Sequence, residues 1–204
     1  MRAPALLSDL DGVLVDSTGS VERAWRGWAS ANGIDFDELA ARLHGVPSRE
    51  TIAAVAPHLD AARESRLLDA GQAEDIEGVV ALPGAADLLA GRYGSPVAVV
   101  TSGDDRLARV RLSAAGLEPP AVFVTSDQVE RGKPDPEAYL LAASRLGRDP
   151  SDCVVIEDAP AGIAAGKAAG MRVVAVLTTH GADDLRDADE VVVDLRGLPG
   201  VLAR

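Results

Sequence analysis

Cysteines, basic clusters and long apolar runs are all scarce in this chain, and each shortage excludes a class of protein. The single cysteine among 204 residues, Cys153, rules out a disulfide framework and is expected to fill core space. The apolar runs are strand-sized, far shorter than the roughly 20 residues that span a bilayer. Arg2 is followed by a short apolar stretch that soon meets two aspartates. We therefore expect no signal peptide, no membrane partner and a cytoplasmic location.

Acidic residues outnumber basic ones, 32 Asp and Glu against 20 Lys and Arg, for a formal charge of −12. No cluster of Lys and Arg is present to neutralise successive phosphates, so nucleic acid is not expected as a partner. One small phosphorylated ligand is compatible with this charge. The length suits one domain, or one domain with a modest insertion.

Residues from about 17 to 80 predict an all-helical segment. Val21, Trp25 and Trp28 recur at helical spacing, and a later helix is expected to begin with Ser48 as its N-cap. Nothing between the first of these helices and Gly78 resembles a strand. The expected helices cover residues 20–31, 37–43, 48–55 and 60–72.

After Leu82, strand-sized apolar runs alternate with helices. Strands are predicted at 97–100, 121–124, 153–156, 172–177 and 190–193, in addition to one near the N-terminus at 5–8. They lack clean polar and apolar alternation, as expected when helices cover both faces of a sheet. The pattern predicts an α/β fold with a doubly wound, Rossmann-like parallel sheet. Residues 1–16 and 81–204 would form this core, and 17–80 a helical insertion after the first strand.

Two aspartates, Asp9 and Asp11, leave the first predicted strand one residue apart. Side chains of an extended chain alternate, so both carboxylates would point the same way. Two acids in one small volume repel each other unless a cation or a proton intervenes, and this favours a metal site. A simple turn before Gly12 is the alternative.

Further polar residues follow the other predicted strands. In doubly wound sheets the ligand binds beyond the carboxyl ends of the strands, so these side chains would converge on the same edge as the two aspartates. Taken singly, each has an ordinary alternative: a solvated lysine, a turn, or acids that favour a helix N-terminus. The residues are Thr101, Ser102, Lys133, Glu157 and Asp158.

Four segments resemble, in order, the signature motifs of the haloacid dehalogenase-like superfamily. They are DLDGV at 9–13, VVTSG at 99–103, RGKPDP at 131–136 and VIEDAPAGI at 155–163. The resemblance spans nearly the whole chain. Each motif alone is weak evidence, but four in this order at fitting spacings are strongly specific.

The resemblance implies a division of labour at the strand ends. Asp9 would be the nucleophile that forms an aspartyl-phosphate, and Asp11 the acid that protonates the departing alkoxide and then activates water. The Thr101 hydroxyl, the backbone N–H of Ser102 and Lys133 would hold the phosphoryl group.

The resemblance also implies Mg²⁺ as cofactor, because this hard cation prefers oxygen ligands. Its ligands would be the Asp9 carboxylate, the Asp11 backbone carbonyl and the Asp158 carboxylate. Glu157 would support them directly or through water.

The segment 17–80 resembles the helical cap of this superfamily, whose specificity loop would lie near His44 and Arg49. Either side chain could contact substrate; a structural histidine and a surface ion pair are the alternatives. His58 and His180 are not expected to take part. The chain looks most like bacterial sugar and sugar-alcohol phosphatases, which are similar to glycerol-3-phosphate and 2-deoxyglucose-6-phosphate phosphatases. The expected partner is a small sugar or polyol phosphate, and the expected state is a monomer.

Three other functions are weighed against the phosphatase. β-Phosphoglucomutases carry a histidine in the hinge where this chain has Val21, which favours hydrolysis over phosphoryl transfer between sugar positions. A phosphate-binding protein without catalysis is disfavoured by the intact acidic residues and lysine. A dehalogenase would not require Asp11.

Overall fold

Six parallel strands form the central sheet, in the order β5-β4-β1-β6-β7-β8. The computed structural model describes residues 3–40 and 45–203. In the middle of the sheet, Leu7 of β1 lies opposite Ala98 of β4 and Val155 of β6. The α/β fold predicted from the sequence is confirmed, with the strand ends within two residues of the expected ones. The strands are β1 (Ala5–Ser8), β4 (Val97–Val100), β5 (Val122–Val124), β6 (Cys153–Glu157), β7 (Arg172–Val176) and β8 (Glu190–Val192).

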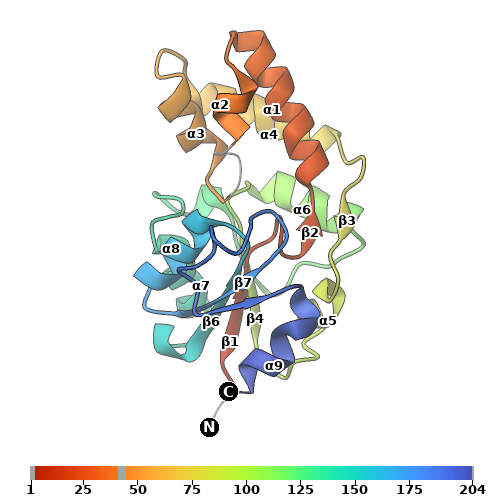
Figure 1. Ribbon diagram of the computed structural model, residues 1–204, viewed down its shortest axis with the longest axis vertical. Helices are drawn as coiled ribbons and strands as arrows, with labels where there is room; N and C mark the ends of the chain where they lie inside the picture. The colour runs from red at the N-terminus through yellow and green to blue at the C-terminus, as the bar shows by residue number, and fades with distance from the viewer. Residues whose placement is uncertain (1–2, 41–44, 204) are drawn as a thin grey trace.

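Helices cover both faces of this sheet (Figure 1). Alternate residues of β1 enter two separate apolar clusters, Leu6 on one face and Leu7 on the other. The Leu6 face packs against α5 (Ala85–Leu89), α6 (Asp105–Ala114) and α9 (Leu198–Leu202), and the Leu7 face against α7 (Glu137–Arg145) and α8 (Pro160–Ala168). Burial on both faces explains why the strands are continuous apolar runs. Short 3-10 helices occupy Ser126–Gln128, Pro150–Asp152 and Leu195–Gly197.

Four helices between β1 and the rest of the sheet stand over the carboxyl ends of the strands (Figure 1). We call them the helical insertion: α1 (Thr18–Asn32), α2 (Phe36–Ala40), α3 (Ser48–Val55) and α4 (Ala61–Glu74). They have an apolar cluster of their own, in which Trp25 and Trp28 meet edge to face with ring centroids 5.5 Å apart. The insertion is therefore a unit with its own core.

A two-stranded antiparallel ribbon joins the insertion to the sheet domain. It pairs β2 (Val15–Asp16) with β3 (Val80–Ala81), so the outgoing and returning chains run side by side. The sequence did not indicate this ribbon, because two-residue strands are too short to show a periodicity. The helices α5 and α9 were also not predicted. Among the described residues, no helix is both long and apolar enough to cross a membrane.

The predicted N-cap of α3 is wrong. The N-cap residue is Pro47, no side chain caps the helix, and Ser48 is already its first residue. The Ser48 hydroxyl instead donates a 2.8 Å hydrogen bond to Oδ1 of Asp69 on α4. The Ser48 hydroxyl, which the local sequence predicts as a helix cap, therefore bonds to a carboxylate of a neighbouring helix instead.

Candidate active site

A buried lysine holds the carboxylate that ends β1. Lys133, in the loop before α7, donates from Nζ to Asp9 Oδ1 at 2.8 Å and to Glu157 Oε1 at 2.7 Å. A third bond, 3.1 Å long, reaches the backbone oxygen of Val100. The Lys133 side chain is 2% exposed. All three N–H groups of its ammonium are thus used, and Asp9 is held at the carboxyl end of β1.

Glu157 is the anchor of this lysine. Its Oε1 also accepts a 2.7 Å hydrogen bond from the Tyr139 phenol, and its Oε2 accepts from the backbone N–H groups of Asp158 and Ala159. Gly162 of α8 makes room for this carboxylate, since a Cβ there would lie 1.7 Å from Glu157 Oε1. Four protein donors therefore orient Glu157. This arrangement favours a supporting role, in which Glu157 holds Lys133 and the neighbouring backbone in place.

Three buried carboxylates, of Asp9, Glu157 and Asp158, each bring an oxygen within 4.8 Å of the others. Lys133 neutralises one of the three charges. The remaining two match a divalent cation, and hard oxygen donors are what Mg²⁺ prefers. Gly12, at φ +80°, permits this packing, because a Cβ at that position would lie 2.0 Å from Asp158 Oδ2. The donor set present in the chain fits the expected metal.

The cost of gathering these charges appears in their pKa values. Burial raises the pKa of Asp9 to about 7, Lys133 works against this rise, and Glu157 adds to it. Burial and the neighbouring carboxylates of Glu157 and Asp9 raise the pKa of Asp158 well above its usual range. Burial alone would lower the pKa of Lys133, but the two carboxylates outweigh it and raise that pKa. The cluster by itself has too much negative charge.

The loop after β7 supports Asp158 from the other side. Thr179 donates a hydrogen bond to Asp158 Oδ2, and Nδ1 of His180 lies 2.9 Å from the backbone oxygen of Asp158. Neither residue was predicted to belong to the site, because no motif marks this loop. His180 thus contacts the backbone of a candidate metal ligand.

A cavity of about 60 Å³ lies between the sheet edge and the helical insertion. Asp9, Asp11 and Thr101 line it from the sheet, and Val21 and Gln72 from the insertion. These three sheet residues were predicted to meet, and the structure brings them together.

Ser102 closes the same cavity beside Thr101. Its hydroxyl donates a 3.1 Å hydrogen bond to the backbone oxygen of Gly45 in the insertion. The Thr101 hydroxyl accepts a 3.1 Å bond from the N–H of Gly103, so the hydroxyl proton is free to point toward a ligand. This loop offers donors to an anion at the end of β4.

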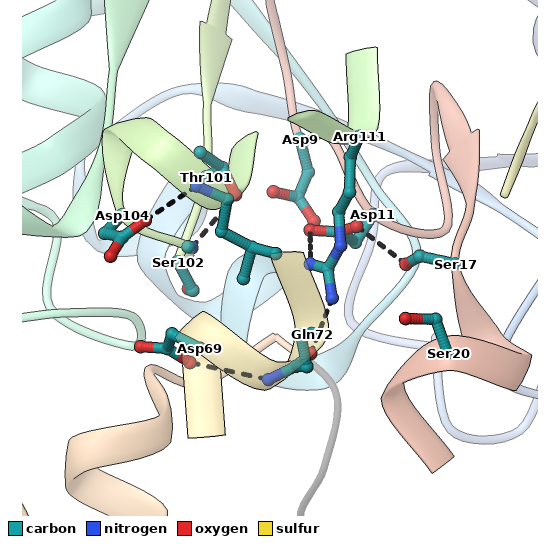
Figure 2. Close-up of polar contacts among 12 residues, drawn as sticks. Asp9, Asp11, Ser17, Ser20, Asp69, Gln72, Thr101, Ser102, Asp104 and Arg111 are labelled. Carbon is teal, nitrogen blue, oxygen red and sulfur yellow. Dashed lines mark hydrogen bonds and ion pairs between the residues drawn. The ribbon is translucent and has the colours of Figure 1, made fainter. Parts of the chain in front are cut away.

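Asp11 is held by two donors (Figure 2). The Ser17 hydroxyl donates to Oδ1 at 2.7 Å, and Nη1 of Arg111 donates to Oδ2 at 2.8 Å. The Arg111 Nη2 reaches Gln72 Oε1 of α4 at 2.6 Å. Arg111 therefore connects a predicted catalytic residue to the insertion, although no sequence motif marked it. The available signal was its place on the buried stripe of α6 with Leu107.

A second acid, Asp69, faces the cavity from α4 (Figure 2). Its Oδ1 accepts from Ser48 and, at 3.4 Å, from Gln72. Burial raises the pKa of Asp69 to about 6, against the opposing effect of the Ser48 bond. The insertion therefore presents polar side chains, among them Asp69 and Gln72, beside apolar ones such as Trp25 to the cavity.

The two residues predicted near the specificity loop have different outcomes. His44 lies outside the described residues. Arg49 is exposed and lines a neighbouring groove between the insertion and the sheet domain, which shares Ser48, Asp69 and Ser102 with the cavity. The structure does not bring Arg49 into the cavity that contains Asp9.

Known proteins share this fold and these segments. Residues 3–170 match the family model of haloacid dehalogenase-like hydrolases. The chain is 46% identical to hexitol phosphatase A of Escherichia coli, over 96% of this chain and 93% of the relative. It is 33% identical to glycerol-1-phosphate phosphohydrolase 2 of Saccharomyces cerevisiae, over 92% of this chain and 80% of the relative.

Solved structures agree. A hydrolase from Pseudomonas syringae superposes with a TM-score of 0.88 at 28% identity, each chain covered to 97%. The β-phosphoglucomutase of Clostridium difficile superposes at 0.81 and 26% identity, over 97% of this chain and 93% of the other. The protein is an enzyme of the phosphoric monoester hydrolase class, and its relatives include a hexitol phosphatase and a glycerol-1-phosphate phosphohydrolase. The chain belongs to the haloacid dehalogenase-like hydrolase family.

Proposed function

We propose that this chain is a Mg²⁺-dependent phosphatase of small sugar or polyol monophosphates that forms an aspartyl-phosphate on Asp9. The observation that carries the proposal is the placement of Asp9, held 2.8 Å from Lys133 in a cavity that also contains Asp11 and Thr101. The nucleophile, its countercharge, the acid and a hydrogen-bond donor for the phosphoryl group are thus within one small volume. The names of the relatives, hexitol phosphatase A and glycerol-1-phosphate phosphohydrolase 2, support the substrate class.

In the proposed first step, an Asp9 carboxylate oxygen attacks phosphorus and the ester P–O bond breaks. Asp11 gives its proton to the departing alkoxide, which is too basic to leave unprotonated at neutral pH. The Thr101 hydroxyl and the Ser102 N–H donate to the phosphoryl oxygens, and the Lys133 ammonium, which is bonded to Asp9, contributes its positive charge. The products of this step are the alcohol and the aspartyl-phosphate.

In the second step, Asp11 takes a proton from water, and the water oxygen attacks phosphorus. The bond between phosphorus and the Asp9 oxygen breaks, which releases inorganic phosphate and regenerates the carboxylate. Asp11 ends protonated, ready for the next ester. The same side chain thus serves as acid and then as base.

The metal would be held by Asp9, the Asp11 carbonyl and Asp158, with Glu157 behind them. When bound, it supplies positive charge to the transferring phosphoryl group. The two excess negative charges of the buried cluster support this assignment.

The helical insertion is proposed to act as a cap that opens for substrate. The cavity of about 60 Å³ is far smaller than the roughly 300 Å³ at the lower end of small-molecule sites. Residues 17–80 would therefore move away from the core formed by 1–16 and 81–204, and then close to exclude water.

The test is phosphate release from a panel of hexitol, hexose and glycerol phosphates with Mg²⁺, with isomerised sugar phosphates followed in parallel. We expect free phosphate without a bisphosphate primer, and no turnover by Asp9→Asn. Primed interconversion of sugar 1- and 6-phosphates would instead identify a mutase. Near-normal rates for Asp9→Asn would refute the nucleophile assignment.

A further inference from the structure

Arg111 contacts the catalytic centre but has no role in the reaction as proposed so far. It comes from α6, its side chain is 5% exposed, and it lines the same cavity as Asp9 and Asp11. Its Nε is the buried side-chain atom without a hydrogen-bond partner among residues 3–40 and 45–203. A guanidinium has five N–H donors and is always charged. A buried donor left unpaired is costly. Arg111 therefore has a hydrogen-bond donor to spare for a ligand.

The position of Arg111 fixes what it would meet. Asp11 must lie within hydrogen-bond distance of the leaving oxygen to pass it a proton. Arg111 Nη1 is 2.8 Å from Oδ2 of that same carboxyl. The guanidinium therefore lies beside the first carbons of the leaving group. The nearest acceptor that a polyol phosphate offers there is the hydroxyl on the carbon next to the phosphorylated one.

Both oxygens of Asp11 are occupied by donors, Ser17 on Oδ1 and Arg111 on Oδ2. When Asp11 acts as the acid, one of its oxygens carries the proton as a hydroxyl and accepts less well, so the donor on that oxygen is the one most readily displaced. Ser17 lies outside the cavity lining, whereas Arg111 is part of it. Figure 2 shows the guanidinium of Arg111 between Asp11 and Gln72.

On the basis of the proposed function, we propose that Arg111 is a substrate-binding residue for phosphate esters with a vicinal hydroxyl. Its guanidinium leaves Asp11 Oδ2 and donates to the hydroxyl next to the phosphorylated carbon. The freed Asp11 oxygen then carries the proton that it donates to the leaving oxygen. Gln72 steers the other arm of the guanidinium from α4, so the contact forms when the insertion is closed. Binding of the leaving group by Arg111 and the freeing of Asp11 from Arg111 thereby occur together.

The test compares kcat/KM for a hexitol 6-phosphate and for its 5-deoxy analogue, which lacks only the vicinal hydroxyl. We expect the wild type to prefer the hexitol ester by about tenfold or more, because a site built to bind a hydroxyl rejects the analogue without it. Arg111→Met should bring the ratio close to one. Arg111→Lys, which keeps the charge but loses the planar fork, should give an intermediate ratio. Arg106→Met, an exposed arginine of the same helix, should keep the wild-type ratio.

The outcomes are distinguishable. A wild type that hydrolyses neither ester refutes the proposed function. An active wild type whose preference is unchanged in both Arg111 variants refutes the role of Arg111 and leaves the function intact. If the Arg111 variants lose kcat/KM by the same factor for both esters, the proposed role in binding the vicinal hydroxyl is also refuted. That result would mean that Arg111 acts only by positioning Asp11. Thermal unfolding of each variant confirms that folded proteins are compared.

Discussion

The ammonium of Lys133 lies 2.7 Å from the carboxylate of Glu157, and neither side chain is more than 2% exposed. This ion pair holds Asp9 in place, because the same ammonium also donates a hydrogen bond to Asp9. Removal of the lysine would leave three buried carboxylates facing one another.

Lys133→Met is expected to abolish phosphatase activity and to lower the free energy of unfolding by about 3–5 kcal/mol, the usual result of breaking a buried ion pair on one side. Urea unfolding and phosphate release measure the two effects. Lys167→Met is the matched control: its pair with Asp189 is exposed, with Lys167 43% accessible, so the loss should stay below about 1 kcal/mol. Equal losses in the two variants would contradict the buried-anchor interpretation.

Gly162→Ala is expected to displace Glu157. The added Cβ would lie 1.7 Å from Oε1 of that carboxylate, so helix α8 or the carboxylate must shift, and Lys133 with it. We expect a stability loss of at least about 1 kcal/mol together with a fall in kcat. Gly27→Ala, in α1 with nothing near the new methyl group, should instead stabilise by roughly 0.5–1 kcal/mol. A Gly162→Ala protein with wild-type kcat would show that Glu157 tolerates displacement.

Tyr139→Phe removes one of the donors to Glu157 and leaves the ring in the core. The phenol donates a 2.7 Å bond to a fully buried carboxylate, and hydrogen bonds to charged groups contribute roughly 1.5–3 kcal/mol. We expect a stability loss of that order, measured by chemical unfolding. Tyr93→Phe serves as control, because Tyr93 is half-buried and its hydroxyl donates to an uncharged acceptor, the backbone oxygen of Leu195, at 3.2 Å. A larger loss at Tyr93 than at Tyr139 would be inconsistent with this account.

The sequence predicted the sheet and the residues at its strand ends well, because both leave local marks. Buried strands are apolar runs, and Asp9 and Lys133 each stand in a short motif of turn-forming residues. Arg111 and Tyr139 stand instead on the inner stripes of α6 and α7, where a polar residue could equally face solvent. Only the packing of helix on sheet places them against Asp11 and Glu157.

The insertion shows the same limit for a different reason. Ser48 has the chemistry of an N-cap, and the sequence alone gives no means to weigh that role against a bond to Asp69, 21 residues further along. Which hydroxyl meets which carboxylate depends on how α3 and α4 pack. Local propensity is overridden by such tertiary contacts.

Asp69→Asn is expected to change stability in a pH-dependent way. Burial raises the pKa of Asp69 from 3.8 to about 6 in the folded protein. Between these values the folded state binds more protons than the unfolded state, so the wild-type free energy of unfolding falls as pH rises through this window. Asparagine does not titrate and can still accept from Ser48. The variant should therefore gain about 1–2 kcal/mol over the wild type by pH 7, and little at pH 4.

Urea unfolding of both proteins at intervals from pH 4 to pH 8 measures this difference. Asp183→Asn, at an exposed position, is the control and should show a flat difference. A constant offset between Asp69→Asn and wild type across the range would refute the assignment of the titration to Asp69.

Mg²⁺ is expected to raise the unfolding temperature of the wild type, with an increase that grows logarithmically with metal concentration. The reason is the buried excess of negative charge, which includes Asp158, whose pKa burial and neighbouring carboxylates raise well above the usual range. Asp158→Asn removes one of these carboxylates and one candidate ligand, so its unfolding temperature should not respond to Mg²⁺. Asp194→Asn, an acid paired with Arg196 away from the cluster, should respond like the wild type. An equal Mg²⁺ response in Asp158→Asn would place the metal somewhere other than the Asp9, Glu157 and Asp158 cluster.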